Sequence, residues 1–552
     1  MPADPPQPTP DTVPTPVRER REWALHTDRD HGDAPMVEVR VTATFTAPSG
    51  AASVIEGFWD GDGTWRVRFN PGETGAWRYR IAAVPPDPDL AREGTFTVVP
   101  AETDRQRRGF LRSTPERAWG FADEAGEPVF LFGDTTYHLF AMAHMGEEAF
   151  AQVEAFLARR AAQGFNLLRI RVPVSRFHHP DGYSDWQVNP VWPWGGSEQM
   201  PRFDQVNLAY FRTVDAVMAR CEELGIGVEL IVEAWGNEFP FNSRHIFTAE
   251  WEEIWFCYLI ARYDAFRSLA IWQLQNEYEY YPNGDWNYPG ATRICDRWAI
   301  RVGHLVRDLA PHGHIVAVHN GPVMPSFGER FRSDPAVIDT VMFQTWGTTG
   351  EADGWLAAGI EEVIAASLGD WPGSAVLAEW GYEFAEDLPP IMLGHRWCGP
   401  DHTRRGAWRG VFSGLGIVHG FHYSWGPYMV LDRDQPGMAD LLQVRILVER
   451  LGIVRDGLRP APDLVAGGDD RRGYTPRALA SDDRERVAIY LPAGGSVTVA
   501  PEVFPSNARW RWIDPRTGEE SLAVPVRSRT FVAPAGDDAD PAHPADWLLV
   551  LE

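Results

Sequence analysis

Hydrophobic and polar positions alternate along the first part of the chain. Between Val37 and Phe45, apolar residues at every second position are separated by Glu, Arg and Thr. The segments TWRVRF and WRYRI repeat this alternation, with DGDG and NPGETG as turns between strands. A period of two residues is typical of a strand with one face in solvent. We therefore predict an antiparallel β-sandwich over residues 22–104, preceded by a disordered Pro-rich leader over residues 1–21.

From about residue 128 the pattern changes to short apolar runs separated by helical segments. In residues 291–310, for example, one helical stripe carries Ile294, Trp298, Val302, Leu305 and Leu309. The candidate strands are PVFLFGD, NLLRIRV, GVELIVE, AIWQLQNE, HIVAVHN, TVMFQTW, AVLAEWG and GFHYSWG. Eight nearly continuous apolar strands alternating with amphipathic helices indicate a (β/α)8 barrel, predicted here over residues 105–458. A doubly wound open sheet is the alternative, disfavoured because no GxGxxG follows the first strand.

Alternation returns after about residue 460, in RVAIYLP, SVTVA, ARWRWIDPRTGE and WLLVLE. The DPRTGE segment reads as a turn between two strands. Residues 459–552 are therefore predicted to form a second β-sandwich. The fold class expected for the whole chain is α/β: a (β/α)8 TIM barrel flanked by an N-terminal and a C-terminal β-sandwich domain.

The charge and aromatic content narrow the range of partners. The chain has 51 Lys and Arg against 77 Asp and Glu, a net charge of −26. Such a charge repels a phosphate backbone or an anionic membrane, so neither nucleic acid nor a membrane is an expected partner. Aromatic residues reach 12% of the chain, with 24 Trp, and rings on concave surfaces can stack on sugars. Carbohydrate is therefore the expected ligand.

The remaining features of the composition concern location and assembly. The N-terminal stretch MPADPPQPTPDTVPTP has no apolar signal region, and no apolar run reaches the length of a transmembrane helix. The 4 cysteines form neither a CxxC pair nor a disulfide framework. These features favour a soluble cytoplasmic enzyme with reduced cysteines, acting on small imported substrates. Its added domains favour a homo-oligomer.

Candidate catalytic groups lie where the predicted barrel strands end, because the active sites of such barrels form at the carboxyl ends of the strands. Glu277 ends the fourth strand and Glu379 ends the seventh. Two carboxylates facing each other about 5–5.5 Å apart are what retaining glycoside hydrolysis requires, one as acid/base and the other as nucleophile. Asn276, beside Glu277, is placed to bind a sugar hydroxyl next to the reacting carbon.

Other strand ends supply candidate substrate contacts. Arg169 and Arg171 share one face of the second strand, so at least one is expected to face the mouth, where its charge would stabilise an ionised Glu379. A structural ion pair is the alternative role for these arginines. Trp346 and Trp425, at the ends of the sixth and eighth predicted strands, could stack on the sugar ring. Core packing is the alternative for these two tryptophans. The predicted substrate-binding residues are Asn276, Arg171, Asp134, Trp235, His319, Trp346 and Trp425.

Two competing assignments use other residues. Glu233 ends the third strand and could replace or orient one of the two catalytic carboxylates. The histidines 138, 178, 179, 319 and 422 raise the alternative of a metal-dependent hydrolase, but the end of the first strand, FGDTTYHLF, lacks the two closely spaced histidine ligands usual there. The chemistry is therefore expected to need no metal and no cofactor.

The segments QNE and AEWG resemble the signature of the large clan of retaining (β/α)8 glycosidases. The resemblance implies that Glu277 is the acid/base and Glu379 the nucleophile. The domain layout also resembles the apiosidase-like glycoside hydrolases, through GFWDGDGTWRVRFNPGETGAWRYRI in the N-terminal β-domain and WIDPRTGE in a C-terminal domain of the collagen-binding type. The strand-four acid of apiosidases is an aspartate, whereas this chain has Asn276-Glu277. That departure favours another uncommon sugar over apiose.

The predicted function is that of a retaining glycoside hydrolase acting on a short oligosaccharide or a glycoside, including a pentofuranoside or another uncommon sugar. Glu277 and Glu379 carry out the double displacement. A transglycosidase would use the same residues with a different acceptor pocket. A non-catalytic carbohydrate-binding protein on a decayed barrel is the alternative from another class, and the presence of both carboxylates disfavours it.

Overall fold

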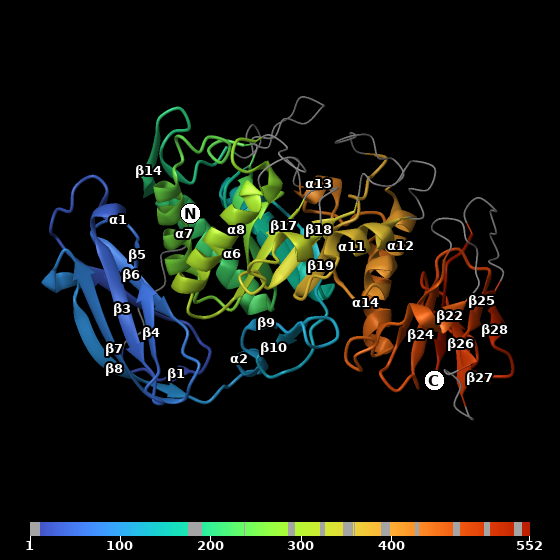
Figure 1. Cartoon of the computed structure of the whole chain (residues 1–552). Helices are drawn as coiled ribbons and strands as arrows, with labels where there is room; N and C mark the ends of the chain where they lie inside the picture. Colours follow the sequence, from blue (N-terminus) through green and yellow to red (C-terminus); the bar gives the residue numbers. More distant parts are fainter. Residues whose placement is uncertain are drawn as a thin grey trace.

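The computed structural model describes residues 11–174, 190–236, 238–284, 293–320, 326–345, 357, 359–387, 398–425, 430–466, 475–501, 508–534 and 544–552. A central barrel lies between two β-domains, with the N-terminal domain in blue and the C-terminal domain in red (Figure 1). In the described part of the chain, no helix is long and apolar enough to cross a membrane.

The N-terminal domain is a sandwich of two sheets, which confirms the predicted architecture. Its strands are β1 (Thr15–Pro16), β2 (Arg21–His26), β3 (Arg40–Thr46), β4 (Ala52–Glu56), β5 (Phe58–Trp59), β6 (Thr64–Phe69), β7 (Gly75–Val84) and β8 (Arg92–Val99). One sheet has the order β1-β8-β7-β3-β4 and the other the order β2-β6-β5. The buried side chains of this domain include Trp23, Phe45, Trp65, Val67 and Phe96, which form one hydrophobic core.

The predicted disordered leader is too long. β1 pairs in parallel with β8, and Asp11 accepts hydrogen bonds from Trp23 Nε1 (3.3 Å) and the Tyr79 hydroxyl (2.6 Å). Residues 11–21 are therefore part of the ordered domain, whereas residues 1–10 lie outside the described part of the chain. The alternation rule missed this segment because its proline-rich sequence contributes only a two-residue strand.

One face of β6 that the pattern assigned to solvent is buried instead. Arg66 and Arg68 are only 7% and 2% exposed. Arg68 donates to Glu22 of the same domain (2.7 Å) and to Asp215 of the barrel (2.7 Å). The two arginines are thus buried because carboxylates of both domains meet them at the domain boundary.

The second domain is the predicted barrel of eight parallel strands. In barrel order the strands are β11 (Phe132–Thr135), β12 (Leu167–Arg171), β15 (Gly227–Trp235), β16 (Leu269–Asn276), β17 (Ile315–His319), β18 (Thr340–Gln344), β19 (Ser374–Glu379) and β20 (Gly416–His419). β11 pairs with β12 on one side and with β20 on the other, so the sheet is closed and the open-sheet alternative is wrong.

Helices alternate with these strands. The helices within the described residues are α1 (Pro35–Glu38), α2 (Asp104–Arg108), α3 (Leu139–Ala143), α4 (Glu147–Ala162), α6 (Leu208–Leu224), α7 (Ala249–Tyr263), α8 (Ile294–Leu309), α9 (Phe327–Arg330), α11 (Ile360–Leu368), α12 (Pro400–Phe412), α13 (His422–Trp425) and α14 (Met438–Arg450). The 3-10 helices are η1 (Pro88–Leu90), η2 (Tyr278–Tyr280) and η3 (Pro462–Leu464).

α6 illustrates why these segments form helices that cover the barrel. The Asn207 side chain accepts from the Tyr210 backbone N–H and caps its start, and Gly225 ends it in the left-handed region (φ 74°). Its buried residues recur at helical spacing, as Phe211, Val214 and Met218 show. One apolar stripe therefore packs against the barrel.

The amino-terminal end of the barrel is closed by a hairpin. The hairpin consists of β9 (Leu111–Ser113) and β10 (Phe121–Asp123), which pair antiparallel. Phe121 belongs to one core cluster with Leu167, Ile271 and Val418, which lie near the starts of barrel strands. A second hairpin, β13 (Trp194–Gly196) with β14 (Pro201–Val206), lies after the second barrel strand. The carboxyl ends of the strands are thus the end at which a substrate can enter.

The predicted position of the eighth strand is wrong by four residues. GFHYSWG was predicted as this strand, but β20 is Gly416–His419 and residues His422–Trp425 form α13. The pattern favoured the aromatic segment over the shorter GIVH run, although GIVH is the run that is buried on both faces. Gly420 lies directly against Tyr382, since a Cβ there would be 1.9 Å from the Tyr382 ring.

The C-terminal domain is a second sandwich, as predicted. Its strands are β21 (Arg459–Pro460), β22 (Val465–Ala466), β23 (Arg477–Ala480), β24 (Val487–Leu491), β25 (Ser496–Val499), β26 (Arg509–Ile513), β27 (Val524–Pro525), β28 (Thr530–Val532) and β29 (Trp547–Leu551). One sheet has the order β21-β23-β24-β29-β26-β27 and the other β22-β25-β28.

Candidate active site

The candidate site is built from the carboxyl ends of neighbouring barrel strands. In β18 and β19, Gln344 is paired with Glu379, and the register shifts just before this pair. A similar shift lies between Glu233 and Trp235, where β15 pairs with β16 near Asn276. Register irregularities of this kind re-aim side chains and are frequent beside active sites.

Glu379 is held at the end of β19 by several donors. It is 4% exposed, and its Oε1 accepts hydrogen bonds from the Tyr137 hydroxyl (2.7 Å) and from Arg169 Nη1 (3.0 Å). Burial raises the pKa of Tyr137, so the phenol stays protonated and remains a donor. His319 Nε2 lies 3.4 Å from the same oxygen. The hydrogen bonds from Tyr137 and Arg169 therefore hold the Glu379 carboxyl in position.

Arg169 links Glu379 to residues of two other strands. Its guanidinium donates to Glu379, to Oε1 of Glu229 (3.0 Å) and to Oδ1 of Asn276 (3.0 Å). Burial raises the pKa of Glu229 to about 7. Because an arginine can only donate, the Asn276 carbonyl must face it, which leaves the amide N–H groups to donate elsewhere.

Glu277 is in a different environment. It follows β16 with a backbone in the left-handed region (φ 51°), and its Oε1 accepts a hydrogen bond from Gln344 Nε2 (2.6 Å). Burial of the carboxyl, together with the charges of Glu279 and Glu379, raises the pKa of Glu277 to about 8. Glu277 therefore carries a proton at neutral pH, and Glu379 is close enough for their charges to interact. A non-glycine residue in this conformation is uncommon and is often found at functional sites.

Arg171 and His319 face the same region as these carboxyls. Arg171 lies over the rings of Tyr137 (3.8 Å) and Trp235 (4.0 Å), and it is 1% exposed. Burial and the nearby Arg169 and Arg171 charges lower the pKa of His319 well below its ordinary value, so its imidazole is neutral. Among the described residues, neither ring nitrogen of His319 has a hydrogen-bond partner.

Three predicted substrate contacts are not brought to this cluster by the described contacts. Asp134 accepts from Arg160 Nε (2.7 Å), and its other oxygen lies 3.9 Å from His419 Nδ1. Trp346 lies outside the described residues. Trp425 ends α13 instead of the eighth strand, and its side chain is likewise outside the described part of the chain. The roles of these three residues stay predictions.

Glu233, the competing carboxylate, is engaged elsewhere. It accepts two hydrogen bonds from Arg244 (3.2 and 2.6 Å) and one from Gln275 Nε2 (2.8 Å). Arg244 also binds Glu252 of α7 (2.6 Å). This network joins β15 to α7, and it occupies the Glu233 carboxyl with contacts inside the protein.

Two tyrosines of the site were missed by the analysis of strand ends. Tyr137 lies two residues past β11, and the Arg171 backbone N–H donates to its carbonyl (3.0 Å). Tyr382 lies past β19, with its hydroxyl 3.2 Å from that of Tyr137. Both belong to one buried cluster with Ile231 and Trp235. The one available signal was their position just after strands that end in candidate residues.

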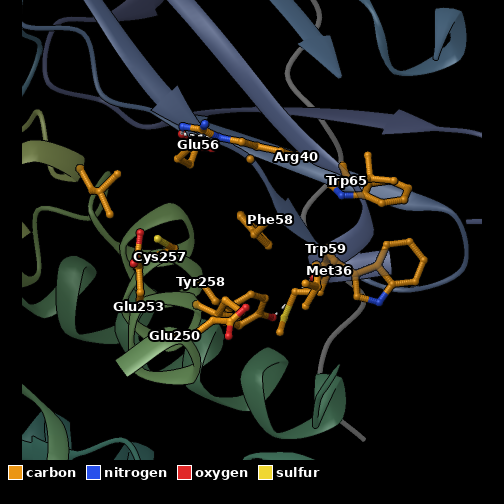
Figure 2. A pocket seen from close by; sticks show the side chains of 15 residues that line it. Met36, Arg40, Glu56, Phe58, Trp59, Trp65, Glu250, Glu253, Cys257 and Tyr258 are labelled. Atoms are coloured by element: carbon orange, nitrogen blue, oxygen red, sulfur yellow. Dashed lines mark hydrogen bonds and ion pairs between the residues drawn. The ribbon is translucent and has the colours of Figure 1, made fainter. Parts of the chain in front are cut away.

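A separate pocket of about 440 Å3 lies between the N-terminal sandwich and α7. Figure 2 shows Phe58, Trp59 and Met36 on the side of the sandwich and Tyr258 and Glu250 on the side of α7. None of its lining residues is among the strand-end residues described above. Because barrel enzymes react at strand ends, the candidate active site is the carboxylate cluster and not this pocket.

A metal centre finds no support within the described ranges. They contain no group of three or more His, Cys, Asp or Glu that could hold a metal ion. His178 and His179, which the metal alternative invoked, lie outside the described residues.

Three family models match the chain. The apiosidase-like catalytic domain matches residues 117–436, a domain of unknown function (DUF5060) matches residues 18–84, and the "Putative collagen-binding domain of a collagenase" matches residues 460–552. No curated protein sequence matches significantly.

Solved structures with similar folds cover most of the chain. A "putative glycoside hydrolase" from Bacteroides vulgatus ATCC 8482 is 18% identical, with a TM-score of 0.68, and the match covers 97% of this chain and 99% of that one. A glycoside hydrolase family 5 protein from the same organism is 16% identical, with a TM-score of 0.58, and the match covers 81% and 94% of the two chains. At these identities the likeness concerns the fold.

Proposed function

The chain belongs to the apiosidase-like family, whose catalytic-domain model spans more than half of it, and from this premise we propose that it is a retaining glycoside hydrolase. The family membership confirms the apiosidase-like resemblance inferred from the domain layout and from the WIDPRTGE segment of the C-terminal domain. In this proposal Glu379 is the nucleophile and Glu277 is the acid/base. The substrate is a short oligosaccharide or a glycoside, and the reaction uses no cofactor.

The observation that carries the proposal is the contrast between the two carboxyls. Glu379 accepts from Arg169 and Tyr137, contacts that favour its charged form. The pKa of Glu277 is raised to about 8 by burial and by the neighbouring Glu279 and Glu379 charges. A carboxyl that keeps its proton at neutral pH suits the acid role, and a carboxyl oriented by an arginine and a phenol suits the nucleophile role.

The reaction would proceed in two steps. In the first, Glu379 attacks the anomeric carbon while Glu277 gives its proton to the departing glycosidic oxygen, which leaves a covalent glycosyl-enzyme. In the second, Glu277 accepts a proton from water, the water oxygen attacks the anomeric carbon, and Glu379 departs as a carboxylate. Two inversions at one carbon retain its configuration.

Neighbouring residues supply binding groups for the sugar. The amide N–H groups of Asn276, left free by the orientation that Arg169 imposes, can donate to the hydroxyl next to the reacting carbon. A hydrogen bond at that hydroxyl strengthens as the oxocarbenium-like transition state forms. His319, being neutral, can both donate to and accept from a hydroxyl. The cytoplasmic location and the homo-oligomeric state inferred from the sequence stay predictions.

The proposal is tested with nitrophenyl pyranosides and furanosides of both anomeric configurations. We expect Glu277→Ala and Glu379→Ala each to lose at least about 100-fold in kcat/KM on the substrate that the wild type cleaves. Added azide should rescue both, with retained glycosyl azide from Glu277→Ala and inverted azide from Glu379→Ala. Proton NMR of the first product of the wild type should show retention.

Glu233→Ala is the matched control, because Glu233 also ends a barrel strand but is bound by Arg244 and Gln275. It should keep the azide-independent mechanism and the stereochemistry of the wild type. If Glu233→Ala abolishes turnover while the other two variants retain it, the assignment of the catalytic pair is wrong.

A further inference from the structure

Arg171 is a buried guanidinium without hydrogen-bond acceptors. It is 1% exposed, and within the described part of the chain none of its Nε, Nη1 or Nη2 atoms has a hydrogen-bond partner. Arg169, two residues earlier on β12, donates to three acceptors. The two arginines of one strand therefore differ: one is fully engaged by the protein and the other is not.

The surroundings of Arg171 hold the guanidinium in place without using its donors. The rings of Tyr137 and Trp235 lie 3.8 and 4.0 Å from it, at cation–π distance. Aromatic faces fix the position of a guanidinium plane, whereas its five N–H donors point outward along the edge of that plane. The side chain is thus positioned to donate to a group that the described residues do not provide.

Arg171 lies next to the place where the sugar would bind. Tyr137, which it contacts, donates to Glu379, and the charge of Arg171 also acts on Glu277. The guanidinium is therefore in the same part of the site as both proposed catalytic carboxyls, close enough for its charge to act on Glu277. Neither of these carboxyls satisfies it, since Glu379 is bound by Arg169 and Tyr137, and Glu277 by Gln344.

A buried cation without acceptors is costly, and a bound group that supplies a negative charge removes most of that cost. A carboxylate matches the guanidinium edge with two parallel hydrogen bonds from its two oxygens, whereas a hydroxyl group offers a single oxygen and no negative charge. We propose that Arg171 binds the carboxylate of an acidic glycone, so that the substrate class of this site is uronosides. This inference rests on the proposed glycosidase function and adds its specificity.

The test measures binding, which needs no turnover. Methyl glycosides of glucuronate, galacturonate and mannuronate, in both anomeric forms, are titrated calorimetrically against the matched neutral glucosides, galactosides and mannosides. We expect at least one uronoside to bind the wild type about 30-fold or more tighter than its neutral partner, as a buried charge-assisted pair implies. Arg171→Gln should lose that preference, and Arg171→Lys, which keeps the charge but not the paired donors, should keep part of it.

Arg244→Gln is the matched control. Arg244 is also a largely buried arginine near the barrel mouth, but its donors are used by Glu233 and Glu252. It should keep the preference for the uronoside, and thermal melts of all variants report whether each is folded. The inference is overturned if no uronoside binds the wild type better than its neutral partner, or if folded Arg171→Gln retains the preference.

Nitrophenyl uronosides separate this inference from the proposed function. Cleavage of a uronoside that is lost in Glu277→Ala and Glu379→Ala supports both. Uronoside binding that depends on Arg171, with turnover unaffected in those two variants, leaves the acidic specificity standing and refutes the catalytic pair. Cleavage of a neutral glycoside as fast as the matched uronoside refutes the specificity alone.

Discussion

The protonation of Glu277 depends on two neighbours that act in opposite directions. Burial raises the pKa of Glu277 most, Glu279 raises it further by charge repulsion, and the Gln344 hydrogen bond lowers it. Glu279→Gln should therefore move the alkaline limb of the kcat/KM profile to lower pH, and Gln344→Leu should move it to higher pH. A hydrogen bond worth about 1 kcal/mol corresponds to a shift of somewhat less than one pH unit.

The sign follows from the role of Glu277 as an acid, which is active only while it is protonated. With a pKa of about 8, the wild type should lose activity as the pH rises through about 8. Profiles of kcat/KM for the wild type and the two variants, on one nitrophenyl substrate, check this. Shifts of both variants in the same direction would contradict the account.

At the level of single residues, the sequence identifies groups by their chemistry at strand ends, and the structure places Glu277, Glu379, Asn276 and the two arginines close together, while their roles stay predictions. The sequence could not predict that Arg169 binds acceptors of the protein while Arg171 has none among the described residues, because both side chains lie on the same face of β12. Glu229, which binds Arg169 and not Arg171, lies on the neighbouring strand β15, and nothing in the sequence indicates this pairing. The role of Tyr137 could not be predicted from the sequence, because its position depends on the path of the chain after β11.

Among the secondary-structure elements, the residue that follows β20 packs against a tyrosine of the candidate site. Gly420 leaves room for the Tyr382 ring, and Tyr382 contacts the Tyr137 hydroxyl that donates to Glu379. Gly420→Ala should therefore displace Tyr382 and lower both stability and kcat. Overpacking of this kind costs about 1–3 kcal/mol in the free energy of unfolding.

Gly72→Ala provides the comparison, since nothing lies within 4 Å of the added Cβ and its backbone is not in the left-handed region. Denaturant unfolding and steady-state kinetics on both variants measure the two effects. Equal stability and equal kcat for Gly420→Ala and Gly72→Ala would show that the contact with Tyr382 has no such role.

Helix and strand positions followed from periodicity more reliably than their exposed faces did. α8 forms as predicted, and Trp298 and Val302 of the predicted stripe are buried, but Ile294 is 41% exposed because it is the first residue of the helix. The alternation in β6 predicted solvent contact for Arg66 and Arg68, which are buried by carboxylates from other elements. A pattern along one segment carries no information about a domain that packs on it.

On the scale of the whole molecule, buried ion networks join both sandwiches to the barrel. Arg404 of α12 binds Asp546 of the C-terminal domain (3.0 Å), and Tyr490 of β24 donates to the same carboxylate (3.1 Å). On the other side, Asp215 of α6 accepts from Arg68 of the N-terminal sandwich and from Arg262 of α7. Breaking one member of such a network leaves a buried charge without a partner.

Asp215 makes the N-terminal boundary sensitive to acid. Burial alone would raise the pKa of Asp215, but the Arg262 and Arg68 charges lower it below its ordinary value. Its contribution to stability is therefore complete above about pH 4, the pKa of an unfolded aspartate, and is lost as the pH falls through the lower value of the folded state.

Asp215→Asn should lower the free energy of unfolding at pH 7 by about 3–5 kcal/mol, and the difference from the wild type should shrink as the pH falls below 4. Asp104→Asn, which changes an exposed carboxylate paired with Arg107, should behave as the wild type. Urea unfolding of the three proteins from pH 7 to pH 3 measures these free energies. The role of the network at the domain boundary would be contradicted if Asp215→Asn and the wild type differed little in the free energy of unfolding at pH 7. It would also be contradicted if that difference grew on acidification.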